Sequence, residues 1–279
     1  MSLASWLTPT SHDARRSVDL VRVATAIVLL SHPLHAIAVP GDAAQLVAAM
    51  AERGIPASVS LAWAALALQL ICGLGLLTRR YAALAALGSI TVLAGGILAI
   101  YAPQWFVVGG AAEDGHPGME LNVLLIVCMV GVARSYWRDP TGAAADRGLE
   151  IIRVGSALSL VPHGAFCFLT WDVEGMREWG AGMSHLGFPC GVALVWSIKG
   201  LELTSALCRL ARRLVVPACF GNLLIIVPGL WIAHAGWFDV GPGENGVEFS
   251  ITLSVCAVAC ILAYWPVREA RAVRALQRA

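Results

Sequence analysis

The sequence predicts an all-α polytopic membrane protein in which eight transmembrane helices form two parallel four-helix repeats. Three observations support this: the composition, the spacing of eight apolar segments, and the distribution of arginine between alternate loops. Of the 279 residues, 58% are hydrophobic and only 13% are charged, whereas a soluble domain carries about 25% charged residues. The net charge of +1 comes with no basic face, so no nucleic-acid partner is expected.

The eight apolar segments are each close to the ~20 residues that a helix needs to cross a bilayer. They cover about 18–39, 57–78, 81–102, 118–137, 150–170, 189–209, 213–236 and 247–266. We expect Pro33, Pro162, Pro217 and Pro228 to be accommodated, because membrane helices tolerate proline. The first twenty residues lack an apolar core and a small-residue cleavage site, so we expect no removable signal peptide.

Arginine is concentrated at one end of the predicted helices. With eight spans, one side of the membrane receives Arg15, Arg16, Arg79, Arg80, Arg134, Arg138, Arg147, Arg209, Arg212, Arg213, Arg268, Arg271, Arg274 and Arg278. The opposite loops hold only Arg53 and Arg177 among many acidic residues. The positive-inside rule therefore predicts that both termini are in the cytoplasm and that loops 103–117 and 237–246 are outside. The expected location of the protein is the cell (inner) membrane.

The two halves of the sequence repeat a series of short motifs. "RVATAIVLLSH" at 22–32 matches "RVGSALSLVPH" at 153–163, and "GIP" at 54–56 matches "GFP" at 187–189. The series continues with Trp63 and Trp196, Gln69 and Glu202, two Arg-Arg pairs, and Gly-x-Glu in "HPGMELN" and "ENGVEFS". The matches keep their order, so we predict four-helix units at 1–139 and 140–279 with a linker at 134–148. Repeats of four spans share one orientation.

This ordered series of motifs resembles the DoxX/DoxD family of four-helix membrane units. The resemblance covers nearly the whole chain, twice over, and its specificity lies in the order of short motifs. It implies quinone as a cofactor, and membrane redox work or an accessory role beside a partner that holds the redox centre. This sequence departs from the pattern at Gln69, which replaces an acidic residue, and at Lys199, which adds a cation. The first unit is therefore expected to be the structural half.

Lys199 and Glu202 are the charged residues inside the sixth predicted span. Residues three apart are neighbours on one helix surface, so an ion pair is predicted. A charge at the bilayer centre costs about 2.5–3.5 kcal/mol on insertion scales, and such groups face a bundle interior or a partner. The pair either only pins helix packing or handles protons or a quinone, with Lys199 donating to a carbonyl and Glu202 exchanging its proton. In the second case Glu202, Lys199 and His163 are the candidate catalytic residues.

The candidate cofactor-binding set is Arg153, His163, Glu248 and Lys199. Arg153 lies near the inner end of its span, and His163 about 15 Å further along the same helix. Glu248 begins the last span from outside, and His163 is its expected partner. A carboxylate beside an imidazole keeps a proton labile near neutral pH. The alternatives are an interfacial anchor for Arg153 and a structural hydrogen bond for His163. The first-half equivalents are Arg22, His32 and Glu120.

Cysteine and histidine patterns favour no other chemistry. The eight cysteines lie mostly in apolar runs without a C-x-x-C motif, so most are expected to be inert. Cys167 and Cys190 could form a disulfide if their spans end close together. A haem between His32 and His163, or one using His35 or His234, is not favoured, because nothing around them is distinctive of haem. No metal site is expected, and His116 is interpreted as a loop residue.

The sequence therefore predicts an integral subunit of a quinone-linked redox system, with the bilayer and other subunits of a membrane redox complex as partners. If the chain is an enzyme, it is a quinone-linked oxidoreductase subunit. Two alternatives remain: a proton-coupled small-molecule transporter, since parallel repeats with charges at mid-depth also suit transport, and a non-catalytic scaffold. Because only the second unit has the full charged set, changes at Glu202 and His163 are expected to impair function more than changes at Glu120 and His32.

Overall fold

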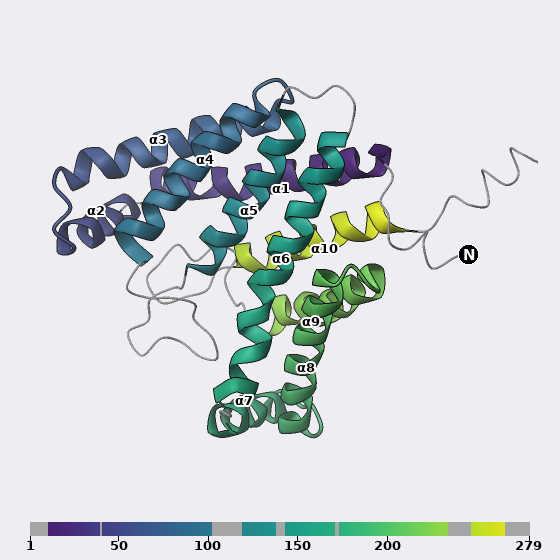
Figure 1. Ribbon diagram of the computed structural model, residues 1–279. Coiled ribbons are helices and arrows are strands. Elements are labelled where there is room, and N and C mark those ends of the chain that lie inside the picture. The colour runs from purple at the N-terminus through teal and green to yellow at the C-terminus, as the bar shows by residue number, and fades with distance from the viewer. Residues whose placement is uncertain are drawn as a thin grey trace, which may run out of the picture.

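A computed structural model describes residues 11–39, 41–101, 119–137, 143–170, 173–233 and 247–265, and its regular structure within these ranges is helical (Figure 1). The predicted all-α fold is confirmed for these residues. The predicted outer loops 103–117 and 237–246, His116, His234 and both chain ends lie outside the described residues.

The first half of the chain contributes α1 (Ser11–Ala38), α2 (Asp42–Glu52), α3 (Ser58–Leu77), α4 (Ala82–Gly96), a π-helical turn η2 (Ile97–Tyr101) and α5 (Glu120–Tyr136). The second half contributes α6 (Ala143–Thr170), α7 (Val173–His185), α8 (Gly191–Leu210), α9 (Val215–Ala233) and α10 (Val247–Tyr264). Helix α6 begins seven residues before its predicted start, because the alanine-rich stretch from Ala143 is itself a good helix former. Pro33, Pro162 and Pro228 lie inside helices, as predicted.

Seven of the described helices are long and apolar enough to cross a membrane: α1, α3, α4, α6, α8, α9 and α10. Helix α5 occupies the remaining predicted span, and its described length is 17 residues. The eight-span prediction is therefore consistent with the structure. Large apolar side chains such as Ile71, Leu84, Leu224 and Trp231 are exposed along these helices. In a multi-pass membrane protein such side chains face lipid.

Two short helices, α2 and α7, precede α3 and α8 and were not predicted from the sequence. They are too short to span a bilayer and mix apolar with polar residues, so a search for apolar segments passes over them. The glycine of a G-x-P motif follows the last residue of each helix by two positions, and these glycines, Gly54 and Gly187, adopt positive φ angles of 71° and 88°. Glycine adopts this conformation without a steric penalty, and it closes the helix before the chain turns into the next span.

Equivalent helices of the two halves make equivalent contacts. Helix α1 packs on α3 as α6 packs on α8, and α4 packs on α5 as α9 packs on α10. Across the halves, α5 packs on α6 as α10 packs on α1, while α1 meets α6 and α5 meets α10 (Figure 1). These last two pairs join equivalent helices, as expected around a pseudo-twofold axis. The predicted unit boundaries at 1–139 and 140–279 stay predictions.

Candidate functional site

Lys199 and Glu202 form the predicted ion pair on α8. Lys199 Nζ lies 2.9 Å from Glu202 Oε2, and the two side chains are only 8% and 14% exposed. The ammonium also lies 4.9 Å from the centre of the Trp179 ring on α7, which is a cation–π distance. The pair is therefore enclosed by its own half of the protein rather than directed at lipid.

His163 lies in the same region as this pair. Its imidazole packs against the Phe249 ring of α10 at 5.3 Å and is close enough to Lys199 to feel its charge. Its Nε2 atom is buried and has no hydrogen-bond partner among the described residues. Glu248 is buried in the first turn of α10, next to Phe249 in sequence. The structure thus gathers His163, Lys199 and Glu202, while the predicted pairing of His163 with Glu248 stays a prediction.

Arg153 makes its hydrogen bonds elsewhere. Its guanidinium binds the Glu150 carboxylate at 2.7 Å and donates to the backbone carbonyl of Arg209. Arg209, the last residue of the predicted sixth span and expected at the inner membrane interface, lies in the last turn of α8 and is fully buried.

The surroundings of Arg153 are repeated in the first half. Arg22 binds the Asp19 carboxylate at 3.0 Å and donates to the carbonyl of Leu76, and the Tyr136 hydroxyl donates to Asp19. Arg79 completes this cluster at 2.7 Å from Asp19. In the second half, Tyr264 and Arg212 contact Glu150 in the same way, with Arg212 at 3.5 Å. The arginine clusters are therefore a shared structural element that ties the first, second and fourth spans of each half together.

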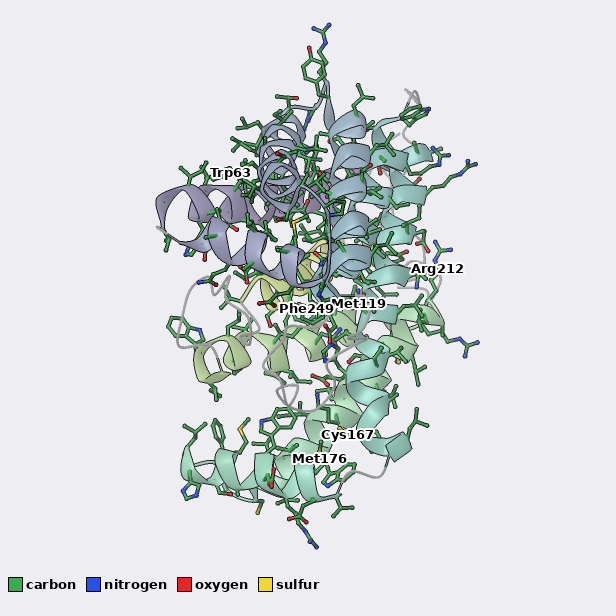
Figure 2. All side chains as sticks on the ribbon, turned by 90° about the vertical axis from the view of Figure 1, so that its left-hand side faces the viewer. Trp63, Met119, Cys167, Met176, Arg212 and Phe249 are labelled. Carbon is green, nitrogen blue, oxygen red and sulfur yellow. The ribbon has the colours of Figure 1, made fainter. Side chains whose placement is uncertain are left out.

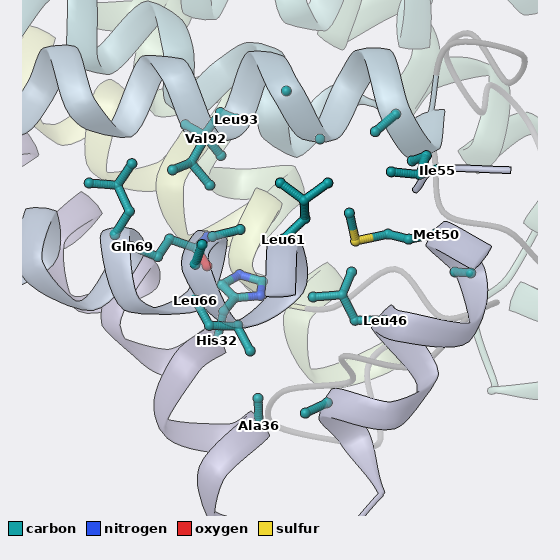
Figure 3. A pocket seen from close by; sticks show the side chains of 18 of the residues that line it. His32, Ala36, Leu46, Met50, Ile55, Leu61, Leu66, Gln69, Val92 and Leu93 are labelled. Atoms are coloured by element: carbon teal, nitrogen blue, oxygen red, sulfur yellow. The ribbon is translucent and has the colours of Figure 1, made fainter. Parts of the chain in front are cut away.

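A cavity of about 1100 Å³ opens in the first half (Figure 3). Its walls come from α1, α2, α3, α4 and α5 and are mostly alanine, leucine and valine side chains. Its polar lining residues are His32, Asp42, Gln45, Glu52, Arg53, Gln69, Thr91 and Asn122. An apolar pocket with a few polar groups is the usual form of a small-molecule site.

A second polar contact borders this cavity. Asp42, which lines it from α2, holds His35 of α1 through a 2.8 Å contact between Oδ2 and Nδ1. His32 lies near enough to both groups to feel their charge. The cavity wall thus carries a carboxylate that is bound to the imidazole of His35 behind it, together with the imidazole of His32.

The ion pair and the cavity occupy equivalent places in the two halves. With the offset that relates GIP to GFP, Leu66 and Gln69 correspond to Lys199 and Glu202. Leu66 and Gln69 line the cavity. The second-half ion pair therefore occupies the two positions that form part of the cavity wall in the first half. The sequence matched Gln69 with Glu202 but gave no sign of the space beside Gln69, because a cavity depends on how five helices pack.

Cys167 and Cys190 have different surroundings. Cys167 is buried in a small cluster with Met176 and Val195, and Figure 2 shows Cys167 and Met176 together near the junction of α6 and α7. Cys190 is exposed at the start of α8.

Comparison with known proteins identifies the family of one segment. Residues 17–102 match the DoxX family model, so the chain carries a DoxX domain that begins in α1 and includes α3 and α4. The family resemblance inferred from sequence is confirmed for this segment, which also contains most of the cavity wall. No curated protein matched the chain. No solved structure matched it.

Proposed function

We propose that this multi-pass membrane protein with a DoxX domain is an integral subunit of a quinone-linked redox system and binds the quinone in the cavity of its first half. The observation that carries the proposal is the cavity itself, which has a volume of about 1100 Å³, a mostly apolar wall, and His32, Gln69 and Asn122 among its polar lining residues. The sequence alone pointed to the second half for cofactor binding. Because the cavity lies in the first half, the proposed quinone site is at His32 and Gln69.

A quinone matches this lining chemically. Its ring carbonyls accept hydrogen bonds, which an imidazole N–H of His32 and the side-chain amides of Gln69 and Asn122 supply. Its prenyl tail requires an apolar channel, and Leu61, Leu66 and Leu93 line the same space. Quinone chemistry also moves protons, and Asp42 on the cavity wall, bound to His35, is placed to hold one. In this proposal Lys199, Glu202 and His163 form the second proton-handling group, in the second half.

We further propose that the chain is a tandem duplication of one four-helix unit. The repeated arginine clusters support it, because a guanidinium, an acidic residue, a tyrosine and a carbonyl recur at equivalent offsets. A partner protein in the same complex is the proposed holder of the redox centre that exchanges electrons with the quinone.

Filling the cavity will weaken quinone binding. Ala65 and Ala67 are both on α3, but only Ala65 lines the cavity, while Ala67 is exposed. In lipid nanodiscs titrated with decylubiquinone, Ala65→Phe is expected to weaken binding at least tenfold and Ala67→Phe to leave it unchanged. Gln69→Leu should weaken it about five- to tenfold, because it removes a hydrogen bond worth about 1 kcal/mol. Equal affinities for both phenylalanine variants would contradict the proposed site.

We propose that both termini are cytoplasmic in the cell (inner) membrane. Ala51 lies in α2, which precedes α3, and Arg80 follows α3. Both positions are exposed, and they report opposite faces because α3 spans the membrane between them. In a Cys190→Ser background, Ala51→Cys should react with an impermeant maleimide on intact cells, and Arg80→Cys only after permeabilisation. The reverse pattern would overturn the orientation.

A further inference from the structure

Two thiols meet at the centre of the protein. Cys128 of α5 and Cys256 of α10 lie 128 residues apart in sequence, and their Sγ atoms are 3.5 Å apart. Both side chains are fully buried. The same offset relates the Gly-x-Glu motifs that precede the two cysteines, so they occupy equivalent positions in the two halves.

The arrangement of the helices explains why these equivalent residues face each other. Helix α5 contacts α10, and α1 contacts α6, so equivalent helices meet at the pseudo-twofold axis. At a twofold interface, a residue on the axis contacts its own counterpart. Cys128 and Cys256 are therefore placed together by the relation between the halves.

Two further cysteines and a buried arginine lie close to this pair. Cys260 follows Cys256 by one helical turn and shares a hydrogen bond with Cys219 of α9. Arg209 is fully buried, and its Nε and Nη1 atoms have no hydrogen-bond partner among the described residues. Its charge is felt at Cys256, Cys260 and Cys219. The pair therefore belongs to a cluster of four cysteines beside a buried cation.

We propose that Cys128 and Cys256 are a redox-active dithiol that a quinone oxidises to a disulfide linking the two halves. In this step an S–S bond forms between the two Sγ atoms. The two thiols lose two protons and two electrons, and the quinone takes up both to become a hydroquinone. The oxidant is the ligand class of the proposed function, so the inference rests on that function.

The cavity and the dithiol are adjacent on α5. Leu125 lines the cavity and precedes Cys128 by three residues, which places the two about 4.5 Å apart along the axis on one helix face. A quinone in the cavity therefore lies against α5 at Leu125, about one helical turn from Cys128.

Cutting the chain between its halves will reveal the disulfide. A protease site inserted between α5 and α6 separates Cys128 from Cys256, and the first half contains only one other cysteine, Cys72. The full chain in nanodiscs is treated with decylubiquinone, whose substituted ring resists thiol addition, then alkylated, cut and run on a non-reducing gel. The halves should stay linked until reduced, with one hydroquinone formed per linked chain. Cys72→Ser should keep the link, and Cys128→Ser and Cys256→Ser should each remove it.

Other results would overturn the proposal. A link that survives Cys128→Ser would come from other thiols. Diamide, a thiol oxidant unrelated to quinones, provides the reference. A link with diamide but not with quinone would mean that the thiols meet without being coupled to quinone, and no link with either would mean that they never pair. Quinone titration of the same nanodiscs measures quinone binding separately. A failure of the dithiol proposal is therefore distinguishable from a failure of the proposed quinone site.

Discussion

Breaking the Lys199–Glu202 ion pair from one side will lower the yield of folded protein, and removing both charges will restore it. The two side chains are 2.9 Å apart and almost fully enclosed. Deleting one member of a buried pair typically costs about 3–5 kcal/mol, whereas replacing both is often neutral. Lys199→Met is expected to be worse than Glu202→Gln, because it leaves a carboxylate that must stay charged without a partner or bind a proton.

The measurement is the folded, monodisperse fraction in mild detergent, with the thermal midpoint as a second readout. The matched control is the exposed pair Glu174–Arg177 of α7, at 3.5 Å with side chains 76% and 66% exposed. Its removal should cost no more than about 1 kcal/mol. If Lys199→Met and Glu202→Gln gave strictly additive losses, the two residues would not interact.

Redox activity of the double variant then distinguishes a packing role of the Lys199–Glu202 pair from a proton-handling role. A pair that only pins packing predicts that the double variant recovers redox activity together with yield. A pair that handles protons predicts that yield returns while activity stays lost.

Neutralising Asp19 will destabilise the protein strongly, and neutralising Glu150 will do so less. Asp19 balances the buried Arg22 and also holds Arg79 at 2.7 Å. Glu150 has the same role towards Arg153, but its side chain is 28% exposed against 13% for Asp19, and Arg212 is 3.5 Å away. Water therefore replaces more of the lost interaction at Glu150.

Asp19→Asn is expected to cost about 3–5 kcal/mol, because it leaves a buried guanidinium without a counter-charge. Glu150→Gln should cost clearly less, and both should lower the thermal midpoint in proportion. Asp19→Asn combined with Arg22→Met should recover much of the loss. An equal loss for Asp19→Asn and Glu150→Gln would contradict this account of burial.

Features that depend on spacing within one segment were predicted well from the sequence. The apolar runs located the spans, and the three-residue spacing of Lys199 and Glu202 predicted their contact. The repeat motifs marked Arg22 and Arg153, which make equivalent bonds in the structure. Their acidic partners Asp19 and Glu150 differ in length and were not matched, although both precede the arginine by three residues.

Features that depend on packing between segments were not predicted. Cys128 and Cys256 share an offset in the sequence, but only the contact of α5 with α10 brings them together. The cavity requires α2, a helix too short to be detected as a span, to lie across α3. Arg209 was interpreted as an interfacial residue because of Arg212 and Arg213 beside it, yet its side chain at the end of α8 is fully buried.

The central claim is that the first-half cavity holds a quinone, and photoaffinity labelling tests it most directly. An azido-quinone analogue bound to the full chain in nanodiscs is photolysed, and the labelled peptides are identified by mass spectrometry. The account predicts labelling of α3 and α4, which excess decylubiquinone suppresses and Ala65→Phe removes. Suppressible labelling confined to α8 and α9, with α3 and α4 unlabelled, would contradict it.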